Sequence, residues 1–567
     1  MKTPYELGNG NQTTTHDACI AFYRALAERF PKVLSFGPVG ETDCGVPLHA
    51  GVVSSDGVFD RAAIQAAGRT VFFLNNGIHP GEPEGIDAAM MLVRDLCIDP
   101  EKLSALGETV LVFVPIYNVD GALNRNDTSR VNQDGPESFG FRGNARHLDL
   151  NRDFVKCDST NARSFNRLFS AWDPAVLVDT HTSNGADYQH TMTLIATQPD
   201  KLGGALGDFL RDTMLPHLYA EMTERGWPMC PYINPRQDIP DDGIEDFLET
   251  PRFSTGYAAL HQVIGFMPET HMLKPFAQRL ESMRALVETV LAFTVKHGAH
   301  LRELRAATRA EDQKRTRWPL QWSIDESRPG TFRLKGFTAR RTPSRLGTYQ
   351  RLSYDRSAPF EKDIPAFNRC KVSLEQTAPR AYLLPQAWRE VVERLQWNQV
   401  ALKRFNRPVR VTAEAYRITS LQTRPTPFEG HPFHDELTLS VEPLEVEAQT
   451  GDWLVPVAQE RARYVVELLE PQGADSFFRW GFFNSVLQRK ETFSDYVFED
   501  VAEQLLEEEP GLRERFDAWK RAHPALLSDP EQVLGFIYNA CQRYREPEFM
   551  RVPVLRVVGA IPEDALS

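Results

Sequence analysis

The chain has 567 residues, of which 42% are hydrophobic and 25% are charged, and its formal net charge is -13. This length exceeds one ordinary hydrophobic core, so we expect about two to four domains. The composition is typical of a globular protein, and the acidic balance argues against nucleic acid or an anionic membrane as the main partner.

Residues 1–305 alternate apolar, strand-like runs with amphipathic helical patterns. In chain order we expect a helix at 15–30, a strand at 70–76, a helix at 84–97, a strand at 109–118, a helix at 160–172, strands at 175–181 and 261–270, and a helix at 276–298. Short apolar strands between helices predict an α/β fold with a mixed, mostly parallel sheet covered on both faces. In such sheets, functional side chains gather where strands end.

The pattern of apolar and polar residues changes after a charged, helix-prone stretch. We expect residues 306–317 to be a connector. Beyond it, alternating runs at 407–419 and 435–449 predict antiparallel strands, and 494–522 predicts helices. The expected organisation is an α/β domain over 1–305 and a β-rich accessory region with appended helices over 318–567. The aromatic-rich segment LLEPQGADSFFRWGFFN (468–484) is typical of a core or a domain interface.

The segment NNGIHPGEPEG (75–85) places His79 and Glu82 three residues apart. Pro80 and Gly81 between them oppose a continuing helix, so the pair is expected on a turn after the strand. One interpretation is a surface turn with solvated polar groups, and the other is half of a metal site. We expect Glu84 to be a solvated carboxylate at the start of the following helix.

A third metal ligand is expected at the end of another strand. Zinc sites that keep one position open commonly use three protein ligands, often two histidines and a carboxylate. Among 14 histidines, His181 both ends a predicted buried strand, AVLVDTH, and precedes a polar loop that contains glycine. The sequence therefore predicts that His79, Glu82 and His181 hold one zinc ion.

Two further segments carry residue types suited to hydrolysis. FRGNARHLDLNRDF (141–154) contains an arginine fork beside an amide, which suits a grip on a carboxylate through two bonds. GFMPET (265–270) brings Glu269 to the end of an apolar run, a good place to accept a proton from metal-activated water. Each segment alone is more typical of a solvated loop or a strand end than of a catalytic site. Their occurrence together, in this order, favours a hydrolytic metal site.

The order H-x-x-E, R, D-x-N-R, H, E resembles that of the zinc carboxypeptidases of the carboxypeptidase A type, over residues 15–300. Carboxypeptidase A is itself a standard example of a zinc site with two histidines and one glutamate. The resemblance implies a carboxypeptidase-like fold and one zinc ion per chain, with His79, Glu82 and His181 as its ligands.

The resemblance also implies roles for five more residues. Arg142 would polarise the scissile carbonyl and steady the oxyanion, while Asn151 and Arg152 would hold the terminal carboxylate of the substrate. Asp149 would hydrogen-bond a zinc-bound histidine, and Glu269 would be the general base.

One element departs from the family pattern. The family commonly has a mobile tyrosine upstream of the general base that donates a hydrogen bond to the substrate. The corresponding position here falls within IEDFLET (244–250), which contains no tyrosine. Tyr257, twelve residues before Glu269, is the remaining candidate for substrate contact.

The seven cysteines and the start of the chain bear on the compartment. The cysteines are scattered singly with no C-x-x-C pair, which predicts buried free thiols in a reducing compartment. The first residues contain no apolar leader, and no apolar run is long enough for a membrane span. We therefore expect a cytoplasmic protein; a periplasmic or secreted one would look the same after removal of a leader.

The function predicted from the sequence is a zinc-dependent hydrolase that removes C-terminal residues from peptides with a free carboxylate. A first alternative is a zinc amidase or deacylase acting on N-acyl amino acids or cell-wall peptides, since related zinc acylases share the same ligands and the asparagine–arginine pair. A second alternative is a non-catalytic peptide-binding protein with the C-terminal region as its working part.

Overall fold

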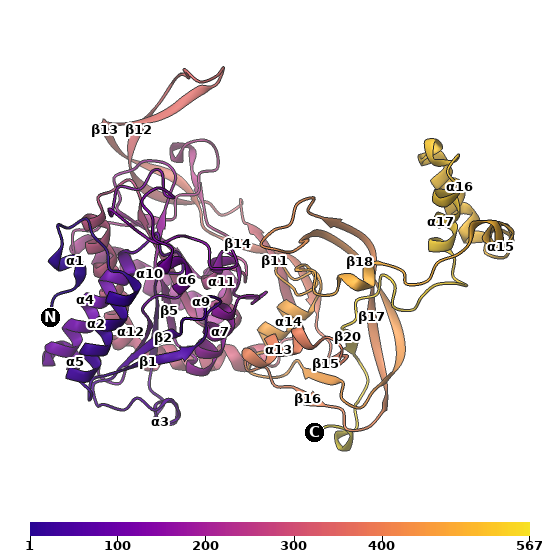
Figure 1. The fold of residues 1–567 in the computed structure, drawn as a ribbon, viewed down its shortest axis with the longest axis horizontal. Helices are drawn as coiled ribbons and strands as arrows, with labels where there is room; N and C mark the ends of the chain where they lie inside the picture. The colour runs from indigo at the N-terminus through magenta and orange to yellow at the C-terminus, as the bar shows by residue number, and fades with distance from the viewer.

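A mixed sheet of nine strands forms the centre of the N-terminal part in the computed structural model, which describes all 567 residues (Figure 1). The strand order is β1-β2-β4-β3-β5-β10-β7-β8, with β6 paired to β10. The strands are β1 (Leu34–Gly40), β2 (Leu48–Val53), β3 (Val71–Asn75), β4 (Val110–Val114), β5 (Val176–Asp179), β6 (His181–Ser183), β7 (Met192–Ala196), β8 (Cys230–Pro231) and β10 (Ile264–His271). The central pairs β4–β3, β3–β5 and β5–β10 are parallel, which confirms the predicted fold class.

Helices cover both faces of this sheet. The helices of the N-terminal part are α1 (Pro4–Leu7), α2 (His16–Arg29), α3 (Arg61–Ala66), α4 (Glu84–Ile98), α5 (Pro100–Ser104), α6 (Val119–Leu123), α7 (Thr160–Trp172), α8 (Pro199–Leu202), α9 (Gly204–Phe209), α10 (Leu215–Glu224), α11 (Ser254–Leu260) and α12 (Phe276–Asp312). Side chains alternate along a strand: Phe72 and Leu74 of β3 pack with α2, α4 and α12, while Val71 and Phe73 pack with α7 and α11. No helix is both long enough and apolar enough to cross a lipid bilayer.

The last helix of the α/β part is longer than the sequence pattern predicts. We expected it to end at 298, but α12 continues to Asp312. Leu301, Arg305, Thr308 and Asp312 are all buried, and their spacing places them on one helix face. The charged stretch thus continues the helix because one side of it packs against the core.

The C-terminal part is rich in antiparallel strands. A six-stranded sheet has the order β16-β19-β15-β20-β17-β18, and two smaller sheets contain β11-β14 and β12-β13-β9. The C-terminal strands are β11 (Arg317–Ile324), β12 (Gly330–Pro343), β13 (Gln350–Phe367), β14 (Cys370–Thr377), β15 (Ala381–Leu384), β16 (Lys403–Arg404), β17 (Val409–Thr423), β18 (His434–Ala448), β19 (Trp453–Pro456) and β20 (Leu555–Val557). β9 (Ile244–Glu245) comes from the N-terminal part and pairs parallel with β13. The predicted β-rich character is therefore confirmed, and β17 and β18 pair antiparallel.

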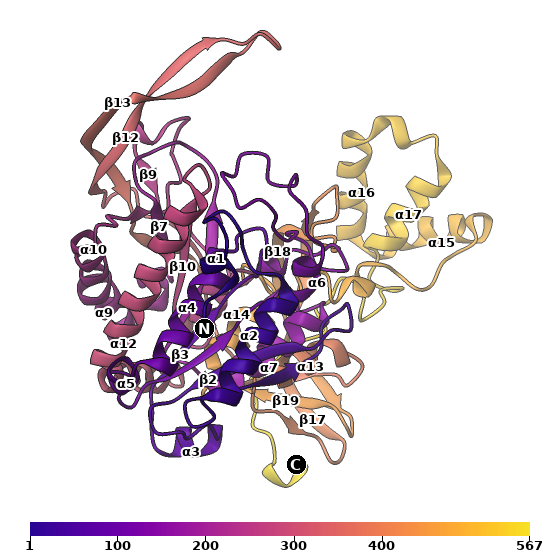
Figure 2. The same cartoon turned by 60° about the vertical axis from the view of Figure 1, so that its left-hand side comes forward.

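Helices accompany these sheets in two groups. α13 (Arg389–Trp397) and α14 (Ala462–Leu469) lie against the six-stranded sheet, whereas α15 (Asp495–Glu508), α16 (Pro510–Ala522) and α17 (Pro530–Ala540) project from it and share a small core of their own (Figures 1 and 2). The β12–β13 hairpin projects from the opposite end of the molecule (Figure 2).

The N-terminal and C-terminal parts share buried side chains. One cluster of 49 buried residues joins Phe165 and Tyr257 of the α/β part to Tyr464 and Trp480 of the C-terminal part. Within the aromatic-rich segment 468–484, Trp480 thus belongs to a core common to both parts. The domain limits at 305 and 318 stay predictions, and the shared core indicates that the two parts fold against each other.

Candidate metal centre and substrate cavity

His79 and Glu82 lie on a tight turn between β3 and α4. The amide of Glu82 donates a hydrogen bond of 2.8 Å to the carbonyl of His79. A Cβ at Gly81 would lie 2.7 Å from Cδ of Arg130 and 3.0 Å from the carbonyl oxygen of Gly140, so only glycine fits without displacing its neighbours. His79 and Glu82 are each 2% exposed, which excludes a solvated surface turn.

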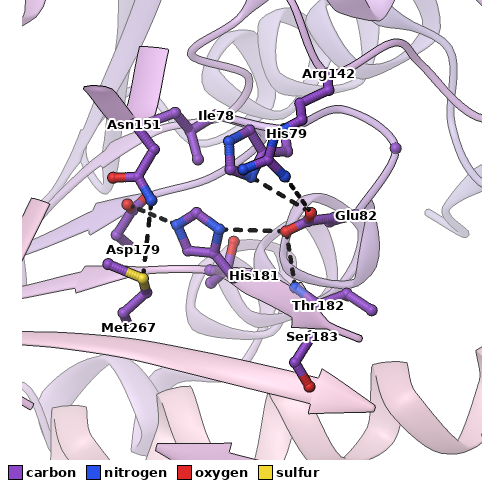
Figure 3. Close-up of polar contacts among 12 residues, drawn as sticks. Ile78, His79, Glu82, Arg142, Asn151, Asp179, His181, Thr182, Ser183 and Met267 are labelled. Carbon is purple, nitrogen blue, oxygen red and sulfur yellow. Dashed lines mark hydrogen bonds and ion pairs between the residues drawn. The ribbon is translucent and has the colours of Figure 1, made fainter. Parts of the chain in front are cut away.

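The parallel pairing of β3 with β5 brings His181 to this turn. Asn75 at the end of β3 is opposite Asp179 at the end of β5, and His181 begins β6 directly afterwards. The ligand atoms of His79, Glu82 and His181 lie within 4.8 Å of one another, close enough to hold one metal ion. Figure 3 shows both rings directed at the Glu82 carboxylate.

The two histidines present the same ring nitrogen to Glu82. Nδ1 of His181 is 3.2 Å from Oε2 of Glu82, and Nδ1 of His79 is 3.4 Å from Oε1. The second contact does not meet hydrogen-bond geometry, so Nδ1 of His79 is buried without a hydrogen-bond partner. Buried polar atoms are normally satisfied, and an ion between the three side chains would satisfy this one.

A carboxylate holds the far nitrogen of each ring. Nε2 of His79 is 2.8 Å from Oδ1 of Asp149, and Nε2 of His181 is 2.9 Å from Oδ2 of Asp179. Each carboxylate accepts the Nε2 proton, which leaves Nδ1 free to bind a metal. Asp179 was missed from the sequence, although the pattern D-x-H in VDTH places both side chains on one strand face.

The metal cluster opens into a cavity of about 430 Å³. Of the residues predicted from the sequence, seven line it: His79, Glu82, Arg142, Asn151, Arg152, His181 and Glu269. They come from the turn after β3, from the loop that contains the 3-10 helix Leu150–Arg152, from the start of β6 and from the end of β10. The structure thus gathers positions spread over almost two hundred residues of chain into one cavity.

Glu269 enters the cavity from β10. It pairs with His181 across the parallel contact of β10 with β6, and it is 9% exposed. Burial raises the pKa of the Glu269 carboxyl to about 8. A divalent cation in the cluster would favour the carboxylate form, which is the form that accepts a proton.

Arg142 and Arg152 are two of the three arginines that line the cavity, together with Arg130. Nε of Arg142 donates to Asp149 Oδ2 at 3.0 Å, and its Nη1 lies 3.4 Å from Glu82 Oε1. Burial opposes charge on Asp149, but His79 and Arg142 hold its pKa below the usual range. The guanidinium of Arg152 lies 4.4 Å above the ring of Phe253.

Comparison with known families agrees with this geometry. Residues 19–183 match the model of the family described as zinc carboxypeptidase, and this range contains all three candidate metal ligands. Residues 19–183 are therefore similar to a zinc carboxypeptidase domain. The predicted family resemblance and hydrolase function are confirmed.

Individual relatives are more distant. Carboxypeptidase 2 of Trichophyton equinum is 23% identical over 435 residues, which cover 72% of this chain and 73% of the relative. Carboxypeptidase 2 of Trichophyton rubrum is 22% identical over 426 residues, with the same coverage of 72% and 73%. The crystal structure of a metallo-carboxypeptidase from Burkholderia cenocepacia has a TM-score of 0.36 at 15% identity, over 51% of this chain and 70% of its own.

Tyr257 does not line the cavity that contains the metal cluster. Its side chain is fully buried on α11, its hydroxyl donates to Oδ1 of Asn398 at 2.6 Å, and its ring packs against Phe154. The substrate contact predicted for Tyr257 is therefore not supported by its position. Tyr232, which lies beside β8, does line the cavity; its spacing from Glu269 gave no signal in the sequence.

Arg130 and Glu84 complete the surroundings of the turn. Nη1 of Arg130, which was missed from the sequence, lies 2.8 Å from Oε1 of Glu82. Glu84 is fully buried, not solvated as expected. It accepts hydrogen bonds from Nε of Arg279 at 2.5 Å and from the hydroxyl of Thr182 at 2.7 Å, so it ties the turn to α12.

Replacement of Asp179 by asparagine should weaken metal binding by His79, Glu82 and His181. The amide would carry no charge to hold the Nε2 proton of His181, and loss of such a partner costs about tenfold or more in metal affinity. Affinity is measured on metal-free protein by competition with a chromogenic chelator, with Zn²⁺ and Co²⁺ as probes. Asp187→Asn is the matched control, because Asp187 is similarly buried and pairs with Arg356 instead. Equal affinities in Asp179→Asn and wild type would contradict the assignment.

Proposed function

We propose that the protein is a zinc carboxypeptidase that removes single residues from the C-terminus of peptides. The observation that carries the proposal is that one cavity contains both a possible metal triad and a grip for a carboxylate. The triad is His79, Glu82 and His181, and the grip is formed by Asn151 and Arg152. A hydrolase with both groups in one cavity would select the free end of a chain.

The donor set fits zinc. Two imidazole nitrogens and one carboxylate oxygen are ligands that zinc accepts in catalytic sites, and the unpaired Nδ1 of His79 is directed at the same point as Nδ1 of His181. His79, Glu82 and His181 would hold one ion per chain. When bound, zinc supplies a Lewis acid that polarises a carbonyl and makes water acidic near neutral pH.

Glu269 would move the proton in this reaction. Its carboxylate takes a proton from the attacking water and later passes it to the nitrogen of the leaving amine. Arg142 would donate to the oxygen that becomes negative, and removal of one such donor typically costs about a hundredfold in rate. The Arg142 side chain is 44% exposed, so it remains accessible to a substrate, and Asp149 holds its guanidinium in place.

The cavity walls suggest which terminal residues would fit. Arg152 offers two parallel donors to a carboxylate, with the amide of Asn151 beside it. The apolar part of the wall consists of Val131, Ile195, Tyr232, Phe247, Phe253, Met267 and Met272. The only carboxylates that line the cavity are those of Glu82 and Glu269. The proposal uses both, one for metal binding and one for proton transfer, so a lysine or arginine side chain of the substrate would find no free carboxylate to pair with. We therefore infer a preference for apolar or aromatic terminal residues.

The polar wall favours a peptide over a small acyl amino acid. Ser129, Asn132, Ser183 and Asn184 also line the cavity, and their donors and acceptors could satisfy backbone groups upstream of the scissile bond. An N-acyl amino acid would leave these groups without partners.

The free state of the cysteines is consistent with a reducing compartment. All seven cysteines are free and six of them are buried, and burial raises the pKa of Cys97 to about 12, which keeps it unreactive. We propose the cytoplasm on this ground.

Glu269→Gln should leave zinc bound and lower kcat by about a hundredfold or more, because an amide cannot take the proton. Zinc content is measured by elemental analysis alongside kcat. Glu221→Gln on α10 is the control, since this side chain lies outside the cavity. Substantial turnover by Glu269→Gln would show that the assigned base is wrong.

Substrate choice separates the carboxypeptidase from an acylase. N-blocked peptides ending in phenylalanine should be hydrolysed with a kcat/KM about tenfold or more above that of peptides ending in lysine. The reason is that the cavity wall offers no free carboxylate to pair with the positive charge of the lysine side chain. The products are identified by their masses, and N-acyl amino acids are tested as substrates beside the peptides. If these small substrates were preferred, the protein would be a deacylase.

A further inference from the structure

Arg252 connects the edge of the cavity to the C-terminal part. Its amide and its Nε each donate 2.8 Å hydrogen bonds to Asp475, and its Nη2 lies 2.7 Å from the same carboxylate, which is fully buried. The guanidinium also packs against the rings of Phe433, Trp480 and Phe428, at 4.6, 5.0 and 5.2 Å from their centroids. The C-terminal part thus encloses Arg252 in a box with one carboxylate and three aromatic rings.

The two residues after Arg252 touch the carboxylate grip. Phe253 lines the cavity and carries the guanidinium of Arg152 above its ring at 4.4 Å. The amide of Ser254 donates to Oδ1 of Asn151 at 3.2 Å, which directs the NH₂ group of Asn151 away from this contact. The segment held by the box is therefore the segment against which Asn151 and Arg152 rest.

A second contact reaches the other side of the grip. The loop 424–433, between β17 and β18, carries Glu429, whose Oε2 accepts a 2.9 Å hydrogen bond from the backbone amide of Asp149. Asp149 begins the short 3-10 helix that contains Asn151 and Arg152. Glu429 has a φ of 49°, a left-handed conformation that costs energy for a residue with a side chain and persists where surrounding contacts hold it.

We propose that the C-terminal part positions the carboxylate grip of the cavity, with Glu429 and Asp475 as the positioning residues. Neither residue lines the cavity; each acts through a backbone or side chain that does contact the grip. The proposal rests on the proposed function in taking Asn151 and Arg152 as the groups that bind the terminal carboxylate. It gives the C-terminal part a role in substrate recognition without a binding site of its own.

The physical reason is that a grip works only when its donors are held still. Arg152 lies on a loop, and loops are the mobile parts of a fold. A guanidinium has to donate hydrogen bonds to both carboxylate oxygens at once. A small displacement of such a group therefore removes much of its contribution to substrate binding. Residues 149–152 are restricted by Glu429, which lies 280 residues from Asp149 in the chain, and by Ser254, which lies 103 residues from Asn151.

The test compares Asp475→Asn and Glu429→Ala with wild type in the full-length zinc-loaded protein. The substrates are N-benzoyl-glycyl-phenylalanine and its C-terminal amide, which lacks the carboxylate. We expect each variant to raise KM for the free acid about tenfold and to change kcat by less than about threefold. The ratio of kcat/KM for the acid to kcat/KM for the amide should therefore fall. Glu429→Gln keeps an acceptor for the Asp149 amide and should restore most of the affinity.

Glu470→Gln is the matched control for Asp475→Asn. Glu470 is equally buried in the C-terminal part, where it accepts hydrogen bonds from Tyr382 and Tyr416, and it does not touch residues 149–152 or 252–254. An equal rise in KM in this control would show a general loss of structure and overturn the proposal. Unchanged KM in both Asp475→Asn and Glu429→Ala would also overturn it.

Hydrogen exchange separates this proposal from the proposed function. In both positioning variants, amides of 149–152 and 252–254 should exchange about tenfold faster, while those of the His79–Glu82 turn keep their wild-type rates. Unchanged exchange at both segments would overturn the positioning role whatever the activity. A wild-type protein that does not prefer the free acid would contradict the proposed function alone.

Discussion

The site depends on keeping the buried carboxylate of Glu82 charged. Burial opposes this charge, but Arg130 and His79 hold the pKa of Glu82 well below its usual range. A charge taken out of water is tolerated only when it is well paired, and here the partners come from the turn itself, from β6 and from the loop that carries Arg130. The same arrangement presents two ring nitrogens and one carboxylate oxygen to a single point, which is what a divalent ion requires.

The sheet places these partners together. β3, β5 and β10 run parallel and end at one edge, so the turn after β3, His181 after β5 and Glu269 near the end of β10 meet there. The carboxylates of Asp149 and Asp179 then set the free nitrogen of each imidazole. Chemistry concentrated at this edge follows from the topology, and the cavity beside it determines which substrates the chemistry can reach.

Local patterns allowed much of the N-terminal part to be predicted. Short apolar runs between helices indicated the α/β sheet, and the spacing of His79 and Glu82 indicated a turn whose hydrogen bond the structure contains. The predictions for Glu84 and Tyr257 failed because burial depends on distant partners. Arg279 lies 195 residues from Glu84, and Asn398 lies 141 residues from Tyr257. No local pattern records such pairings.

The proposed role of the C-terminal part could not be predicted from the sequence, because the contacts on which it rests also join residues far apart in the chain. Glu429 meets the Asp149 amide across 280 residues of sequence, and Asp475 meets Arg252 across 223. The aromatic-rich segment 468–484 signalled an interface by its composition, but what Trp480 packs against emerges only from the fold. The two parts share one buried cluster, so substrate recognition and the packing of the C-terminal part are coupled.

The proposed activity is the release of a C-terminal residue, supported by a metal ion in this cavity. The most direct test follows the mass of one N-acetylated peptide ending in phenylalanine, incubated with the protein with and without a chelator. We expect a product lighter by one terminal residue, which should not form in the presence of the chelator and should form again when zinc is added. Cleavage at an internal bond, removal of the acetyl group alone, or an unchanged rate in the presence of chelator with the metal gone would contradict it.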